Sequence, residues 1–158
     1  MEGIERARTG KVSLVGGASG AIAGLVAITP AAGVSGPLGA MLLGAASSLA
    51  CYGFVGAAKS RLRIDDSLDV FGIHGLGGIV GSVALVIAGL PAIGGQGGYE
   101  LLPQLGVQLL GVLIAIVWAG LGSALCFAIV RLALPLRAAP SQERDGLDLA
   151  EHGQRAYN

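Results

Sequence analysis

The residue with the clearest chemical potential is His74, whose imidazole lies within a long apolar segment. The other histidine in the sequence, His152, lies in a polar stretch near the C-terminus. In a soluble core a lone histidine is usually structural. Within a membrane span, however, desolvation makes the charged imidazole costly, and even the neutral ring needs hydrogen-bond partners. We therefore predict that His74 lines a pore or handles a proton.

Three aspartates, Asp65, Asp66 and Asp69, precede His74 at the expected start of the same helix. A helix that begins at Asp66–Ser67 would place His74 ~12 Å along its axis, inside the apolar layer. The exposed backbone N–H groups and the dipole of a helix start favour carboxylates, so we expect Asp65 and Asp66 to cap this helix. Asp69 lies one turn deeper, and the sequence leaves open whether it caps the helix or serves the site near His74.

Other signatures of site chemistry are absent from the sequence. Cys51 and Cys126 lie in apolar runs without CxxC or Cys/His spacing, which favours small buried hydrophobic residues over metal or disulfide roles. The sequence shows no Ser/His/Asp arrangement, no metal-ligand spacing and no pair of intramembrane aspartates. We therefore expect neither an enzyme nor a bound cofactor or metal.

The elements that position His74 follow from composition and charge. The chain has 158 residues, 53% hydrophobic and 13% charged, with a formal net charge of zero, which excludes an ordinary soluble domain and offers no basic face for nucleic acid. Charged residues are absent from 12–58 and from 101–130, as in membrane spans. We predict an all-α, polytopic transmembrane helix bundle over 1–137, with a cytoplasmic tail over 138–158. The expected spans are at about 12–29, 38–58, 67–90 and 103–130.

The basic residues predict an orientation for this bundle. Lys and Arg lie before the first span, between the second and third, and after the fourth, and they are absent from the other two loops. Because such basic segments stay on the cytoplasmic side, we expect both termini in the cytoplasm and a multi-pass protein of the inner (plasma) membrane. The residues concerned are Arg6, Arg8, Lys11, Lys59, Arg61, Arg63, Arg131 and Arg137.

Glycines recur at helical spacing in two of the expected spans. Gly16, Gly20 and Gly24 repeat every four residues, and Gly77 and Gly81 show the same spacing. Where no side chain intervenes, helix backbones can approach closely, so we expect most of these glycines to serve helix packing.

Three segments together resemble a known family. They are 65–82 (DDSLDVFGIHGLGGIVGS), 17–33 (GASGAIAGLVAITPAAG) and 146–158 (GLDLAEHGQRAYN). In order and spacing they resemble the ammonium transporter/Rhesus family, and the last segment resembles the tail of the bacterial ammonium transporters. The resemblance extends from about Gly10 to the end of the chain.

The resemblance implies a fold and a transport path. Family members have eleven membrane helices and form homotrimers with one conduction path per subunit, and the four spans match the last four helices. By this match His74 is the second of two paired pore histidines, and Ile22, Thr29 and Val70 line the path beside it. Asp69 matches an acidic residue that supports this site. The implied substrate is ammonium or ammonia, in a membrane-lipid environment.

The C-terminal segment resembles a regulatory tail. The resemblance implies that it packs on the cytoplasmic face, and it allows a P-II-type nitrogen-signalling protein as a partner. Gln154 stands where the family more often has an acidic residue. The tail residues that match are Gly146, Leu147, Asp148, His152, Gly153 and Tyr157.

The sequence departs from the family in what it lacks. It contains neither a second intramembrane histidine nor helices that match the first seven of the family. Two hypotheses follow. The chain is the C-terminal part of an ammonium transporter and forms an incomplete pore by itself, or it is a non-transporting remnant or membrane interaction partner of intact transporters.

Overall fold

The computed structural model describes residues 1–62 and 66–154, and within these ranges the regular elements are all helical. Four helices are long and apolar enough to cross a membrane: Leu14–Ala31, Pro37–Ala57, Phe71–Ala88 and Leu101–Ala133. This confirms the predicted class of a polytopic helical membrane protein. The first span comprises α2 (Leu14–Ile28) and a 3₁₀ turn, η1 (Thr29–Ala31), and the second is α3 (Pro37–Ala57). The third span comprises a π-helical turn, η3 (Phe71–Gly75), and α4 (Leu76–Ala88). The fourth span is α5 (Leu101–Ala133).

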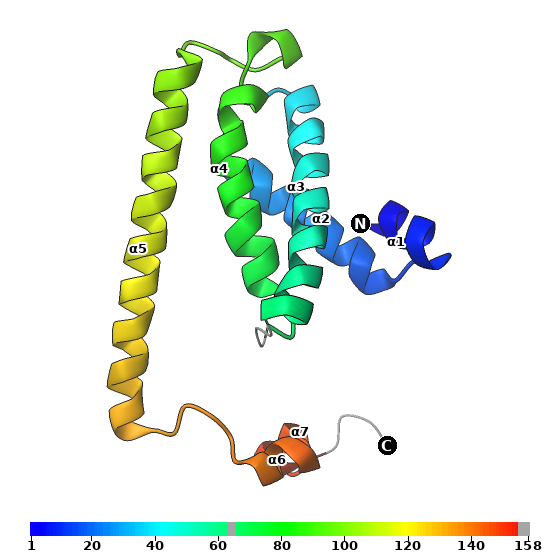
Figure 1. Ribbon diagram of the computed structural model, residues 1–158, viewed down its shortest axis with the longest axis vertical. Helices are drawn as coiled ribbons and strands as arrows, with labels where there is room; N and C mark the ends of the chain where they lie inside the picture. The colour runs from blue at the N-terminus through cyan, green and yellow to red at the C-terminus, as the bar shows by residue number, and fades with distance from the viewer. Residues whose placement is uncertain (63–65, 155–158) are drawn as a thin grey trace. The chain divides into compact units, whose positions relative to one another are not determined.

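The chain divides into two compact units, Met1–Leu113 and Ile114–Asn158, which we call unit 1 and unit 2. In unit 1, helices α2, α3 and α4 pack against one another (Figure 1). Their shared core consists mostly of small residues with a few larger ones: Ala27, Ala31, Leu43, Leu85, Val86 and Ala88.

Glycines bring the backbones of these helices together. A Cβ at Gly24 would lie 3.6 Å from the Cα of Gly44, so α2 and α3 meet almost backbone to backbone. At Gly81 a side chain would collide with the backbone of Ala27, because α4 crosses α2 there. The expected packing role is confirmed for Gly24 and Gly81. Gly16 differs, since a side chain there would meet Glu5 of the short helix α1 (Glu2–Thr9) instead.

Helix α1, which the sequence did not predict, lies against the start of α2. The Glu5 carboxylate accepts hydrogen bonds from the backbone N–H of Ser13 at 3.0 Å and from its hydroxyl at 3.1 Å. The Ser13 hydroxyl in turn accepts from the N–H of Gly16 at 2.9 Å and caps α2. A carboxylate at this end of α2 is favoured by the helix dipole.

The third span begins later than expected, at Val70–Phe71 rather than at Asp66–Ser67. The Asp66 carboxylate accepts from the N–H groups of Val70 (2.8 Å) and Phe71 (2.9 Å), so Asp66 caps the helix across an intervening turn. Asp69, with a positive φ of 57°, turns the chain just before the helix. His74 is therefore only about one turn from the helix start, ~6 Å along the axis, and the expected depth of ~12 Å was wrong. Asp65 lies outside the described residues.

At the other end of unit 1, the loop before α5 is tied to the loop before α3. The Gln96 amide donates from Nε2 to the carbonyl of Gly33 at 2.7 Å, and the Gln96 backbone N–H donates to the carbonyl of Val34 at 2.9 Å. The Tyr99 hydroxyl donates to the carbonyl of Val86 at 3.1 Å and thereby satisfies the end of α4. The short 3₁₀ turn η4 (Pro91–Ile93) lies within this loop.

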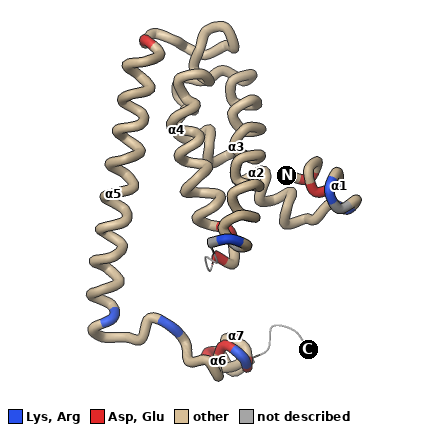
Figure 2. Tube along the Cα trace, viewed as in Figure 1, with Lys and Arg blue, Asp and Glu red and all other residues tan. Residues whose placement is uncertain are grey.

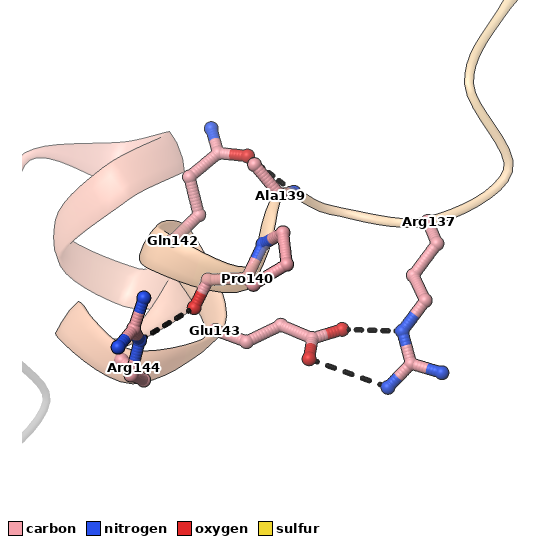
Figure 3. Close-up of polar contacts among 6 residues, drawn as sticks. All are labelled: Arg137, Ala139, Pro140, Gln142, Glu143 and Arg144. Carbon is pink, nitrogen blue, oxygen red and sulfur yellow. Dashed lines mark hydrogen bonds and ion pairs between the residues drawn. The ribbon is translucent and has the colours of Figure 1, made fainter.

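Unit 2 contains the end of α5 and a tail with two short helices, α6 (Pro140–Asp145) and α7 (Leu147–His152). Figure 3 shows the contacts that begin α6: Arg137 Nε donates to Glu143 Oε1 at 2.7 Å, and the Ala139 N–H donates to Gln142 Oε1 at 2.9 Å. Gly146, between the helices, and Gly153, after α7, have positive φ angles of 96° and 66°.

Replacing Gln96 with alanine is expected to lower the free energy of unfolding by about 1 kcal/mol, because one amide-to-carbonyl hydrogen bond is lost. The measurement is unfolding of the micelle-bound chain by sodium dodecyl sulfate, followed by circular dichroism. Gln104→Ala is the matched control, since in the described ranges the Gln104 side chain makes no hydrogen bond. Equal effects of the two substitutions would contradict the role given to Gln96.

The hydrogen bond from Arg137 lowers the pKa of Glu143 from its ordinary value. A lowered pKa in the folded tail means that this interaction stabilises the tail above the unfolded pKa and is lost as the pH falls through the folded pKa. A carbon-13 NMR titration of the side-chain carboxyl should show the lowered pKa in the native chain. Arg137→Gln should return it toward the ordinary value, whereas Arg144→Gln should not, because Arg144 donates to the Pro140 carbonyl. An unchanged Glu143 titration in Arg137→Gln would rule out the contact.

Candidate functional site

The imidazole of His74 lies on the exposed side of η3, in the first turn of the third span. Its chain neighbour Ile73 points the other way and is only 4% exposed, in a core cluster with Ala23 and Cys51. Within residues 1–62 and 66–154 the His74 ring makes no hydrogen bond. The backbone at this point is thus anchored in the core while the imidazole is presented outward.

Val70 shares the exposed side of this helix with His74. It lies four residues earlier and is 52% exposed, and side chains at this spacing lie on the same face. Further along the helix, a Cβ at Gly78 would meet nothing within 4 Å, so the surface beyond His74 is open. The face that carries His74 is therefore apolar and uncovered in unit 1.

Ile22 and Thr29 lie seven residues apart on one face of the first span. Ile22 is 41% exposed, and Thr29 is exposed, as is Leu25 between them. The Thr29 hydroxyl donates to the Leu25 carbonyl at 2.9 Å, so its hydrogen is already used within the helix. In the described part of the chain, no hydrogen bond joins His74 or Val70 to Ile22 or Thr29. The structure therefore shows two exposed apolar faces rather than one closed path.

Asp69 supports the His74 turn through its backbone. Its carbonyl accepts from the N–H of Ile73 at 2.8 Å, the residue next to His74. Its side chain lines a cavity together with Ile73, Arg8 and Arg61, and His74 is not among the residues around that cavity. Asp69 thus fixes the start of the helix that carries His74 through its backbone carbonyl.

A buried polar contact behind His74 was not anticipated from the sequence. The Ser47 hydroxyl donates to the carbonyl of Ala23 at 2.9 Å, and the Cys51 sulfur lies 3.9 Å from the carbonyl of Ile73. Both side chains are fully buried. Their positions four residues apart on α3 were the available signal, because this spacing puts them on one helix face. They link α3 to both α2 and η3.

The two cysteines do not share one environment. Cys51 is buried, as expected for a small hydrophobic residue, but Cys126 is exposed on α5, where the expectation of burial was wrong. No residue of α5 is buried. A long apolar helix of this kind exposes its side chains to lipid or to further helices, which explains why an apolar run does not guarantee burial.

The tail residues expected to be regulatory lie in and around α7. Leu147, Asp148 and His152 belong to this helix, and Gly146 and Gly153 flank it. Tyr157 lies outside the described residues. In the described part of the chain, no group of three or more His, Cys, Asp or Glu side chains could hold a metal ion.

Comparison with known proteins shows which family has this sequence and architecture. The sequence matches the Ammonium Transporter Family over residues 2–157. An ammonium transporter of Aquifex aeolicus (strain VF5) is 40% identical over 151 residues, which are 94% of this chain and 36% of that protein. An ammonium transporter of Bacillus subtilis (strain 168) is 36% identical over 151 residues, which are 93% of this chain and 37% of that protein.

A solved structure named "Sensor Amt Protein" superposes with a TM-score of 0.80 at 30% identity, covering 94% of this chain and 36% of that one. The chain thus spans little more than a third of the length of these relatives. Since the family match covers nearly every residue, the protein belongs to the ammonium transporter family.

Proposed function

We propose that this chain supplies one wall of an ammonium-conducting path, with His74 as a pore histidine, and that further helices complete the path. The observation that carries the proposal is the exposed imidazole of His74 on an apolar helix face, next to a residue fixed in the core. Membership of the ammonium transporter family supports the substrate. The coverage of about 36% of the relatives' length supports a partial path.

The proposed mechanism uses the apolar surroundings of His74. An apolar path rejects a hydrated cation, so ammonium must shed water and its proton before ammonia crosses. A neutral imidazole offers one ring nitrogen as donor and the other as acceptor, and a pair of imidazoles can therefore pass a proton between them. His74 is one member of this pair, and the second belongs to the completing helices.

Val70, Ile22 and Thr29 are proposed to line the same path. Val70 and Ile22 contribute apolar surface, which disfavours water and ions. The Thr29 hydroxyl, which already donates to Leu25, retains lone pairs with which it can accept a hydrogen bond from ammonia. Asp69 supports the path by fixing the turn at the start of η3.

The protein is a multi-pass membrane protein, and we place both termini in the cytoplasm. In unit 1 the Lys and Arg residues that the structure describes lie on or just after α1 and in η2 (Ala58–Leu62), as Figure 2 shows. The opposite loops, tied together by Gln96, contain no Lys or Arg. Basic segments on one side of the spans support a cytoplasmic location for that side.

Assembly and regulation are proposed from the same family. A homotrimer would cover apolar helix faces such as that of α5, none of whose residues is buried. The tail helices α6 and α7 present polar and charged side chains that a P-II-type signalling protein could contact. The solved neighbour named "Sensor Amt Protein" supports a link between this fold and signalling.

A second candidate function is a membrane interaction partner that does not transport. The observation in its favour is again the uncovered apolar helix face around His74. This face could bind an intact transporter as well as the helices that we propose to complete the path. The two candidates differ in whether His74 is needed for uptake.

Cysteine labelling is expected to place Ser141 in the cytoplasm and Ser35 outside. Cys126 is exposed and must first be replaced with serine, and Cys51 with alanine, so that each single cysteine reports alone. In intact cells an impermeant maleimide should then label Ser35→Cys but not Ser141→Cys. The reverse pattern would invert the topology.

Expressed alone in cells without their own transporters, the chain should not take up labelled methylammonium. Co-expression with the seven N-terminal helices of a relative should restore saturable uptake, and His74→Ala should reduce it, because one member of the proton-sharing pair is lost. Glu100→Gln, a control at an exposed residue before α5 that has no role in the path or the tail, should leave transport through the path unchanged. Saturable uptake by the isolated chain, insensitive to His74→Ala, would refute the proposal.

A further inference from the structure

A cavity of about 670 Å³ opens in unit 1 between α1, the start of α2, the end of α3 and η2. Its volume is in the range of small-molecule pockets, roughly 300–1,000 Å³. It is distinct from the proposed ammonium path, because His74, Val70, Ile22 and Thr29 do not line it.

Two arginines from separate elements line this cavity. Arg8 comes from α1 and Arg61 from η2. In residues 1–62 and 66–154, neither guanidinium has a hydrogen bond or an ion pair. Each guanidinium carries five N–H donors and no acceptor, so the cavity presents unused charged donors.

Hydroxyl groups add neutral donors to the same wall. The half-buried side chains of Ser19 and Tyr52 line the cavity, and in the described ranges neither makes a hydrogen bond. Ser13 and Ser60 also line it, but they are engaged: Ser13 with Glu5 and Gly16, and Ser60 with the carbonyl of Gly56 at 2.7 Å.

Two carboxylates, Glu5 and Asp69, also line the cavity, and both already have partners. Glu5 accepts hydrogen bonds from the N–H and the hydroxyl of Ser13 and lies at the positive end of α2. Asp69 likewise has interactions of its own. Among the described lining residues, Arg8, Arg61, Ser19 and Tyr52 are donors whose side chains make no hydrogen bond, and two of these four carry positive charge.

We propose that this cavity binds a phosphate group, held between the guanidinium groups of Arg8 and Arg61 with the hydroxyls of Tyr52 and Ser19 as further donors. Arginine matches the geometry of phosphate oxygens, and its charged hydrogen bonds are stronger than those between neutral groups. The phosphate belongs to the headgroup of an anionic phospholipid or to free phosphate. The proposal does not rest on ammonium transport.

The surroundings of the cavity favour the lipid source. Val15, which also lines it, is 70% exposed, and the neighbouring Leu14 is 91% exposed. A headgroup in the cavity would leave its acyl chains beside these apolar side chains at the start of the first span. Basic pockets at the cytoplasmic end of membrane helices are a recurrent setting for anionic headgroups.

The test follows the arginine side-chain Nε–H resonances of the full chain in detergent micelles by NMR. The chain is titrated separately with phosphatidylglycerol, zwitterionic phosphatidylcholine and inorganic phosphate. Saturable shifts are expected for Arg8 and Arg61 and not for Arg6, which lies two residues from Arg8 on α1 and does not line the cavity. Arg8→Gln and Arg61→Gln should each weaken binding about tenfold, the loss of a charge-assisted hydrogen bond. Arg6→Gln, the matched control, should not.

The titrations distinguish a lipid headgroup from free phosphate, and they also show whether the site exists. Saturation by phosphatidylglycerol but not by inorganic phosphate supports a lipid headgroup, and saturation by inorganic phosphate alone supports free phosphate. Absence of saturable shifts with either would overturn the site. Equal binding of phosphatidylglycerol and phosphatidylcholine would also overturn the site. Equal losses of binding affinity in Arg6→Gln and Arg8→Gln would do the same, since either result would indicate adsorption to the surface rather than binding in the cavity. None of these outcomes depends on uptake of ammonium.

Discussion

The close approach of the α2, α3 and α4 backbones determines where every other part of unit 1 can lie. Gly24 meets Gly44 across one interface, and Gly81 meets the Ala27 backbone across another. In a membrane the hydrophobic effect does not drive helices together, so such contacts must supply packing and bring buried polar groups within reach. At this short separation the Ser47 hydroxyl reaches the carbonyl of Ala23 on α2. A side chain at Gly81 would collide with the Ala27 backbone and push α4 away from α2, whereas a Cβ at Gly24 would make ordinary van der Waals contact with Gly44.

The same packing explains why one side chain of the third span is rigidly held and the next is presented outward. Ile73 fills the core beside Cys51, and the Asp66 carboxylate and the Asp69 carbonyl occupy the N–H groups at the helix start. Fixing the backbone in this way limits the positions open to the His74 imidazole. The proton-sharing pair of imidazoles that we propose needs such preorganisation, because hydrogen bonds weaken steeply when distance and angle depart from the optimum.

Much of this architecture could be predicted from the residues, and the exceptions have physical reasons. Long uncharged runs predicted the four spans, and a lone histidine in one of them predicted the candidate site.

The start of the third span was misplaced because Asp66 caps it across a turn, which depends on the positive φ of Asp69 rather than on a local sequence signal. Helix α1 was missed since it is polar and short, and its contact with the start of α2 includes the hydrogen bond between Glu5 and Ser13, which no local sequence pattern predicts. The roles of Ile22, Thr29 and Val70 came from family resemblance alone, because exposure on an apolar face does not distinguish a path from a lipid-facing surface. Family membership, by contrast, supports the expectation that the chain is not an enzyme.

The central claim is that the exposed face around His74 is covered by helices from the N-terminal part of an ammonium transporter. Site-specific photo-cross-linking tests it directly, with a photoreactive amino acid at position 74 and the seven N-terminal helices of a relative expressed in the same cells. A covalent product that joins the two chains through position 74 is predicted, together with its loss when the N-terminal helices are omitted. Cross-links from position 74 only to lipid, while the two chains co-purify, would contradict the claim.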